Sequence, residues 1–228
     1  MKQVIQIRCK NNKKNINVAI GSTLSEVFSQ INLEMPYGPI CAKVNNKVVG
    51  LHYRLYHNKD VEFLDMTSGS GSRNYTRTLF FILSKAVKDL WGDVRVVIDI
   101  PVSNGYYCDL QLGRPVTADD VARLKSRMQE IIAAALPVKR HETTTDEAIE
   151  LFSRLGDTSK ARLLKTTGRM YTVYYDIDGY YDYYYGSLLT NTSQIYLFGL
   201  DLYYDGVLLR IPSVDNPGQL PPMIQQNK

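Results

Sequence analysis

Residues 78–91 read Thr-Leu-Phe-Phe-Ile-Leu-Ser-Lys-Ala-Val-Lys-Asp-Leu-Trp, and an apolar stretch then leads into Asn104-Gly105-Tyr106-Tyr107-Cys108-Asp109. The first run places its apolar side chains three and four positions apart, which predicts an amphipathic helix. Apolar residues 94–100 predict a strand that ends before Pro101, and the Asn-Gly pair predicts a tight turn into a second strand. A helix followed by a hairpin indicates a mixed α+β fold.

The chain beyond this hairpin predicts further helices and then a strand-rich final third. Thr117 and Thr145 stand at positions where helices begin, and apolar residues follow both at helical spacing. Residues 158–165 predict a short helix. Four strands are then expected, separated by Asp-Gly turns, over residues 170–177, 180–185, 194–201 and 207–211. We therefore expect residues 75–211 to form one larger α+β domain.

The first 66 residues predict a smaller mixed unit. Apolar residues alternate along residues 4–9 and again along residues 16–20, which predicts a β-hairpin. Thr23 and Glu26 then have the spacing of a capping box, in which each side chain accepts a hydrogen bond from a backbone N–H at the start of a helix. Three short strands are expected after that helix, within residues 40–64. The order is hairpin, helix and returning strands.

Two segments have the composition of linkers. Residues 67–74 contain Ser-Gly-Ser-Gly-Ser and predict a flexible joint between the two domains. A phosphate-binding loop is a poorer interpretation, because that motif requires Gly-Lys-Ser/Thr after its first glycine and four further residues. Residues 212–228 are rich in Pro, Gln and Asn, and they are interpreted as a tail or a linker to a further domain.

The positive charge of the chain is concentrated in its first part. Residues 1–66 carry nine Lys or Arg against five Asp or Glu, whereas the remainder carries eighteen of each. Lys10, Lys13 and Lys14 lie together in the expected hairpin turn, where they form a candidate surface for nucleic acid or a partner. A turn with solvated lysines is the alternative. No apolar run approaches the roughly 20 residues of a membrane helix, so no membrane partner is expected. The three scattered cysteines favour reduced thiols, and we therefore expect the protein in the cytoplasm.

The elements around the quoted stretch resemble the second additional domain of threonyl- and alanyl-tRNA synthetases over about 125 residues. In the hydrolytic members of that family, one helix carries His-x-x-x-His and a later segment carries Cys-x-x-x-His. The first pair of positions falls on Phe81 and Lys85, and the second pair falls on Tyr184 and Leu188. None of the four offers an ordinary metal ligand. The resemblance therefore implies a retained fold with a degenerate pocket, no metal and no catalytic residue.

The remaining histidines do not replace these ligands. His52 and His57 belong to the first domain, and His141 is expected in a loop over residues 139–142. No Ser/His/Asp or Cys/His grouping in the sequence points to a nucleophile.

Tyrosine is unusually abundant near the end of the second domain. Eight of the seventeen tyrosines lie between Tyr171 and Tyr185. On strands, alternate rings would face solvent, where they could form a platform for bases or a partner. Tyr183, Tyr184 and Tyr185 are the candidates for such binding, although tyrosine also suits an ordinary half-buried sheet.

The first 66 residues are similar to the TGS domain, a β-grasp (ubiquitin-like) module, through Ile-Gly-Ser-Thr-Leu-Ser-Glu-Val at residues 20–27. A TGS-like module followed by this degenerate domain resembles the N-terminal region of a bacterial uridine kinase-like nucleoside kinase. That resemblance implies a non-catalytic binding or regulatory region whose partner is a downstream P-loop domain. ATP and Mg²⁺ would then be needed only by the kinase domain, with no cofactor in this chain.

Two alternatives remain open at the level of sequence. One is a trans-acting aminoacyl-tRNA hydrolase with altered site residues, and the other is a tRNA- or RNA-binding module related to threonyl-tRNA synthetase. A small-molecule effector of the degenerate pocket is also compatible with the residues.

Overall fold

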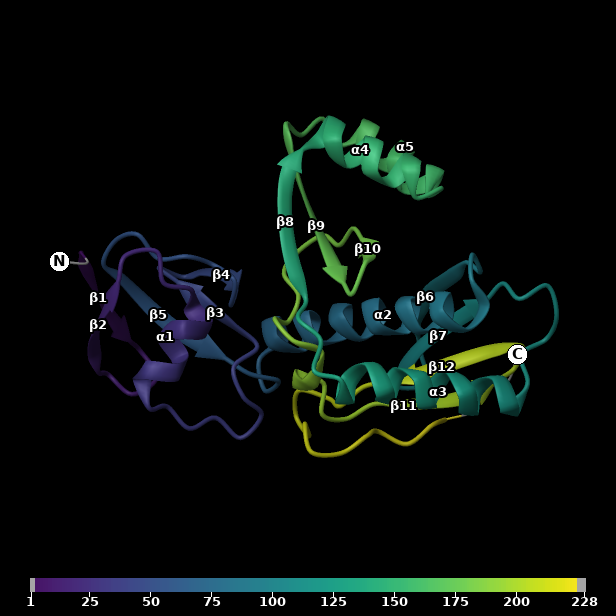
Figure 1. Ribbon diagram of the computed structural model, residues 1–228. Helices are drawn as coiled ribbons and strands as arrows, with labels where there is room; N and C mark the ends of the chain where they lie inside the picture. Colours follow the sequence, from purple (N-terminus) through teal and green to yellow (C-terminus); the bar gives the residue numbers. More distant parts are fainter. Residues whose placement is uncertain (1–2, 225–228) are drawn as a thin grey trace. The chain divides into compact units, whose positions relative to one another are not determined.

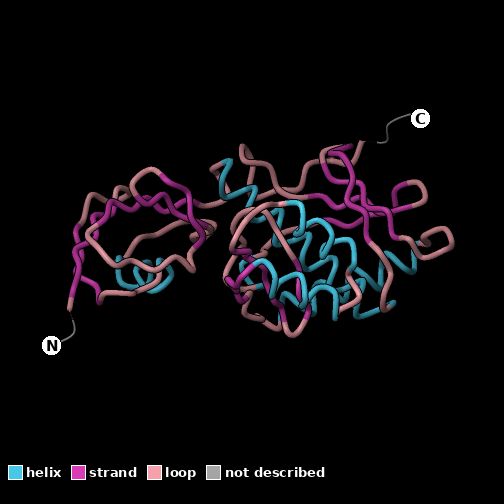
Figure 2. The backbone as a smooth tube through the Cα atoms, turned by 90° about the horizontal axis from the view of Figure 1, so that it is seen from above, coloured by secondary structure: helices cyan, strands magenta, loops and turns pink. Residues whose placement is uncertain are grey.

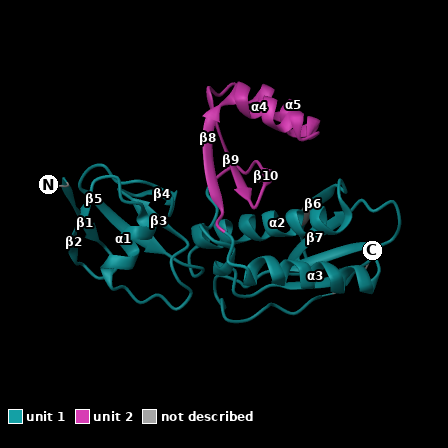
Figure 3. Ribbon diagram, viewed as in Figure 1, with its two compact units in different colours: residues 1–136, 187–228 teal, residues 137–186 magenta. Residues whose placement is uncertain are grey.

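The computed structural model of the protein describes residues 3–224 and shows a mixed α+β fold with three separate sheets (Figure 1 and Figure 2). Its contacts divide the chain into two compact units, coloured in Figure 3. The larger unit comprises residues 1–136 and 187–228, and the smaller unit comprises residues 137–186. No helix among the described residues is long and apolar enough to cross a membrane.

The larger unit begins with a five-stranded sheet and one helix. The strands lie in the order β2-β1-β5-β3-β4, with β1 and β5 parallel and the other neighbours antiparallel. Their bounds are Val4–Cys9 for β1, Asn15–Ala19 for β2, Cys41–Val44 for β3, Lys47–Gly50 for β4 and Lys59–Leu64 for β5. Helix α1 spans Leu24–Ile31, and Thr23 and Glu26 form the predicted capping box.

The two faces of this sheet differ in polarity. Along β1 the side chains of Ile5, Ile7 and Cys9 are buried, and they share one core with Leu24 and Val27 of α1. Because successive side chains of a strand point to opposite faces, the exposed residues between them face away from the helix. One face of the sheet is therefore covered by α1. The other face is polar and exposed along β1, whereas Cys41 of β3 and Leu64 of β5 are buried on it.

Helix α2 spans Gly69–Trp91. The prediction that residues 67–74 form a flexible joint is wrong, because residues 69–74 are helical. Ser68 caps the helix by accepting a hydrogen bond from the backbone N–H of Gly71 at 3.0 Å. A Cβ at position 71 would lie 1.8 Å from the carbonyl oxygen of Asp65, so only glycine fits there. Glycine here permits a close approach of two backbone segments and does not provide flexibility.

A four-stranded sheet completes the larger unit, in the order β11-β12-β7-β6. The strands span Val96–Val102 for β6, Gly105–Leu110 for β7, Gly199–Tyr203 for β11 and Gly206–Arg210 for β12. Helix α3, Ala118–Ala133, packs against α2 and β11. The helix and the hairpin predicted from residues 78–109 are confirmed, but β6 does not end before Pro101 and continues to Val102, where it still pairs with β7. The strand expected over residues 194–201 begins only at Gly199, after a short 3₁₀ helix at Thr192–Gln194.

Residues 212–224 form neither helix nor strand, but hydrogen bonds hold them against the larger unit. The hydroxyl of Tyr196 donates to the carbonyl of Pro217 at 2.9 Å. The guanidinium of Arg210 donates to the carbonyl of Pro221 at 2.8 Å. The part of the predicted tail that the structure describes is therefore attached to the body, and residues 225–228 lie outside the described part.

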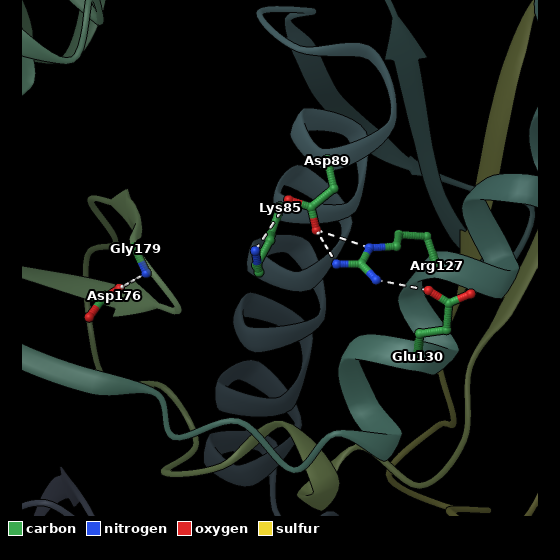
Figure 4. Close-up of polar contacts among 6 residues, drawn as sticks. All are labelled: Lys85, Asp89, Arg127, Glu130, Asp176 and Gly179. Atoms are coloured by element: carbon green, nitrogen blue, oxygen red, sulfur yellow. Dashed lines mark hydrogen bonds and ion pairs between the residues drawn. The ribbon is translucent and has the colours of Figure 1, made fainter.

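The smaller unit contains a three-stranded sheet, β10-β9-β8, and two helices. The strands span Lys139–Thr144 for β8, Tyr171–Ile177 for β9 and Tyr180–Asp182 for β10, and the helices span Thr145–Arg154 for α4 and Thr158–Thr166 for α5. Ala148, Phe152, Ala161 and Leu164 form its core. In the turn from β9 to β10, Asp176 accepts a hydrogen bond from the backbone N–H of Gly179 at 2.7 Å (Figure 4).

Two predictions for the smaller unit are wrong. Residues 139–142, expected in a loop, belong to β8 and pair with β9. Residues 180–185, expected as one strand, form a strand only as far as Asp182, so Tyr183, Tyr184 and Tyr185 do not alternate along a strand.

Candidate functional site

The first candidate site is one face of α2. Asn74, Thr78, Phe81 and Lys85 are spaced four, three and four residues apart, so they lie on the same side of the helix. All four are buried, and Phe81 is 0% exposed. Phe81 and Lys85, the positions predicted to correspond to the metal-binding pair, are therefore part of a packed interior.

The chain returns to this face just after residue 186. The hydroxyl of Ser187 donates to Asn74 Oδ1 at 2.5 Å, and the backbone N–H of Leu189 donates to Thr78 Oγ1 at 2.9 Å. Leu188, between them, is fully buried. The structure thus brings the segment of Leu188 to the helix that carries Phe81 and Lys85. Tyr184 belongs to the smaller unit, where it is half-buried.

Lys85 belongs to a network of charges that joins α2 to α3 (Figure 4). Its Nζ lies 3.2 Å from Asp89 Oδ1, and only 6% of its side chain is exposed. Arg127 donates from Nε and Nη2 to Asp89 Oδ2 at 3.0 and 2.9 Å, and from Nη1 to Glu130 at 2.8 Å. A charged lysine offers protons and no lone pair, so Lys85 acts as an ion-pair partner here.

Residues 3–224 contain no group of three His, Cys, Asp or Glu side chains arranged to hold a metal ion. Burial raises the pKa of the Cys41 thiol to about 11 and that of Cys108 to about 12, so both stay protonated at neutral pH. A protonated, buried thiol is neither a metal ligand nor a nucleophile.

The second candidate site lies at one end of the five-stranded sheet. Lys10 donates from Nζ to Asn46 Oδ1 at 3.2 Å, so the turn between β1 and β2 lies beside the turn between β3 and β4. The first turn contributes Lys10, Lys13 and Lys14, and the second is followed at once by Lys47. The sequence alone does not show that these two turns are neighbours, because their proximity depends on how the strands pair.

The third candidate site lies in the smaller unit. Tyr185 is 71% exposed, and the guanidinium of Arg169 lies 5.3 Å from the centre of its ring. Tyr183, in contrast, packs against the core of α4 and α5. Of the three candidate tyrosines, Tyr185 is the exposed one, and the guanidinium of Arg169 lies over its ring. Arg169 was not singled out in the sequence, because nothing there places it beside Tyr185.

The cations of α5 differ in their availability. Lys160 Nζ lies 2.8 Å from carboxylate oxygens of both Asp157 and Asp182. Burial of Lys160 opposes its charge, but these two carboxylates outweigh burial and hold its pKa above the ordinary value. Lys160 is thus a structural group, whereas Arg162 and Lys165 are exposed.

Comparison with known proteins finds similarity to threonine–tRNA ligases. The chain is 31% identical over 146 residues to that of Desulforamulus reducens, which covers 64% of this chain and 23% of the relative. It is 34% identical over 137 residues to that of Natranaerobius thermophilus, covering 60% and 22%. It is 28% identical over 149 residues to threonine–tRNA ligase 2 of Bacillus subtilis, covering 65% and 23%. No family model matches the chain.

The similarity is therefore partial. The chain spans about a quarter of the length of the curated relatives it matches. It supports the predicted likeness to threonyl-tRNA synthetases and gives no support to the predicted likeness to a nucleoside kinase.

Proposed function

We propose that this chain is a non-catalytic tRNA-binding module related to threonine–tRNA ligases. The observation that carries the proposal is the similarity to those ligases combined with the burial of Phe81 and Lys85 on α2. The relatives act on tRNA, as their names state, and the similarity covers 60% or more of this chain in each relative cited above. The helix that would carry catalytic ligands serves here as core.

The finer assignment of the fold is part of this proposal. Residues 1–66 form a β-grasp module like the TGS domain, which the order β2-β1-β5-β3-β4 with a single helix supports. Residues 75–211 correspond to the second additional domain of the synthetases. The bound partner is tRNA, and no cofactor is assigned to this chain.

Two surfaces are proposed to contact the RNA. The lysines of the β1–β2 turn, Lys10, Lys13 and Lys14, supply charge for phosphates. Tyr185 with Arg169 supplies an exposed ring on which an unpaired base can stack, with a guanidinium beside it. Each surface belongs to a different unit, so each can be tested separately.

The hydrolase alternative is less well supported. It requires Lys85 to act on a substrate, but the Lys85 ammonium is buried and bonded to Asp89. The nucleoside kinase interpretation remains a prediction from resemblance, and we do not build on it.

The proposal is tested by binding of labelled tRNA to the full chain over a range of salt concentrations. The variant K13Q/K14Q is expected to reduce the slope of log K against log salt by about 1.4–1.8, since each phosphate contact contributes about 0.7–0.9. The control R95Q/K125Q removes the same charge from residues outside these surfaces and is expected to leave the slope unchanged. Tyr185→Ala is expected to weaken binding roughly tenfold through loss of stacking.

Two results would contradict the proposal. One is the absence of tRNA binding at low salt by the wild-type chain. The other is release of amino acid from charged tRNA above background, which would make the chain an enzyme.

A further inference from the structure

The exposed face of the five-stranded sheet contains a polar hollow of about 300 Å³. Its lining comes from three strands and the segments beside them: Gln6, Arg8, Asn15, Asn45, Asn58, Lys59 and Asp60. In the strand register, Arg8 of β1 lies opposite Asn15 of β2 and beside Asp60 of β5. The hollow is therefore built on the sheet face that α1 does not cover.

Two of the amides in this hollow are oriented by the backbone. Asn58 Oδ1 accepts a hydrogen bond from the backbone N–H of Gln6 at 2.8 Å, and Asn45 Oδ1 accepts one from the backbone N–H of Asp60 at 3.1 Å. Each carbonyl oxygen is thus engaged with the sheet, which turns the NH₂ group of the same side chain away from it. Both amides consequently present hydrogen-bond donors on the lining.

The charges of the hollow are complementary to an anion. Arg8 contributes a cation from the exposed face, beside the carboxylate of Asp60, and Lys59 lines the hollow from the end of β5, where its register partner is Ile7. Among the described residues neither Arg8 nor Lys59 forms an ion pair, whereas Lys43 on the same sheet is paired with Glu62 at 3.3 Å. Two fixed amide donors beside the guanidinium of Arg8, with Lys59 at the end of β5, form the kind of site that binds phosphate oxygens.

We propose that this hollow is a phosphate-binding site, formed by Arg8 and Lys59 with the amides of Asn45 and Asn58. The phosphate is either a phosphodiester of bound RNA, in which case the site rests on the function proposed above, or a free phosphate group. The site adjoins Asn46, the residue that contacts Lys10, so it continues the basic end of the sheet.

The test compares two single variants with a matched control. Asn58→Asp and Asn45→Asp each keep an oxygen that accepts the backbone N–H but replace the donor with a negative oxygen. Asn45 has φ 47°, and aspartate tolerates this left-handed conformation nearly as well as asparagine. The control Ser25→Asp makes the same charge change at an exposed position of α1, on the opposite side of the sheet.

The full ¹⁵N-labelled chain is titrated with inorganic phosphate and, separately, with a single-stranded RNA oligonucleotide. The side-chain NH₂ signals of Asn45 and Asn58 are followed by NMR. Both probes are expected to shift these signals in the wild type and in S25D. N45D and N58D are each expected to bind inorganic phosphate roughly tenfold more weakly, as for the loss of one charge-assisted hydrogen bond.

The outcomes separate this proposal from the proposed function. Shifts with inorganic phosphate but none with RNA would support the site for a free phosphate and contradict RNA binding there. A shift of the Asn45 signal with RNA that is lost in N58D would support a phosphodiester. Unshifted amide signals with both probes, or wild-type affinity in both Asn→Asp variants, would overturn the site, even if tRNA still bound elsewhere on the chain.

Discussion

The pair formed by Lys85 and Asp89 allows a direct test of whether Lys85 is structural. Its two atoms, Nζ and Oδ1, lie 3.2 Å apart, with 6% of the Lys85 side chain and 23% of the Asp89 side chain exposed. Arg127 also contacts Asp89, at 2.9 Å. The proposed perturbations are Asp89→Ala, Lys85→Met and the two combined.

The expected magnitudes follow from which charge is left behind. Asp89→Ala leaves the Lys85 ammonium buried without a counter-ion, a change that costs about 3–5 kcal/mol in buried pairs. Because Asp89 is about a quarter exposed, we expect the lower end, about 3 kcal/mol. Lys85→Met fills a similar volume with an apolar chain while Arg127 still neutralises Asp89, so its effect should stay within about 1 kcal/mol.

The assay is urea unfolding followed by circular dichroism, with a double-mutant cycle. In the Lys85→Met background, Asp89→Ala no longer strands a buried ammonium, so its cost should fall by about 1–2 kcal/mol. Asp93→Ala is the matched control, since Asp93 pairs with Lys88 but its side chain is 91% exposed, and it should change stability by less than about 0.5 kcal/mol. Equal costs of Asp89→Ala in both backgrounds would refute the reasoning, as would wild-type stability of Asp89→Ala itself.

Three further predictions concern residues of the larger unit. Gly71→Ala should lower the thermal midpoint by several degrees or prevent folding, because its Cβ would lie 1.8 Å from the Asp65 carbonyl oxygen. The control Gly69→Ala, whose Cβ would meet only the end of the Arg73 side chain at 3.5 Å, should fold. The hydrogen bond from Arg114 holds the pKa of Asp120 well below its ordinary value of 3.8. This carboxylate should therefore stabilise the fold fully above about pH 4 and progressively less as the pH falls. In urea unfolding, the free energy of unfolding of D120N should depend less on pH in the acid range than that of the wild type. F81H/K85H should lower stability without any rise of the thermal midpoint on adding Zn²⁺, since Leu188 supplies no ligand, and a zinc-dependent rise would show a restored site.

The sequence predicted the elements whose apolar pattern is complete. Apolar residues at helical spacing located the body of α2, and Asn104-Gly105 located the turn before β7. β8 was missed because its residues are polar, Lys-Arg-His-Glu-Thr-Thr, and all are at least partly exposed. A strand without an apolar face shows no alternation of apolar and polar residues in the sequence. β8 is recognised as a strand only through its pairing with β9.

The start of α2 was missed for a different reason. Ser-Gly-Ser-Gly-Ser has the composition of a flexible linker, but Ser68 caps a helix there and Gly71 fits against the backbone of Asp65. Composition reports what a free chain prefers, whereas here a tertiary contact decides the conformation. The sequence could not supply that contact.

The candidate sites show the same limit. Phe81 and Lys85 were singled out through the resemblance to the synthetase domain, but Arg127, which contacts Asp89 from α3, lies 38 residues from Asp89. Likewise Asn45 and Asn58 become useful only because strand pairing places their amides around Arg8. Residues that act within one element were predictable, and those that meet across elements required the structure.

Burial of Phe81, Lys85 and Leu188 also bears on where binding can occur. A metal site on α2 would need lone pairs that open toward a substrate, and such polar groups are costly to bury without partners. Phe81 and Leu188 remove that cost with apolar packing, and Lys85 meets it through Asp89. The helix face thereby gives up access to substrate and supports the core. The binding proposed above then depends on exposed groups, such as the amides of Asn45 and Asn58, which backbone N–H groups hold in place, and the ring of Tyr185 near Arg169.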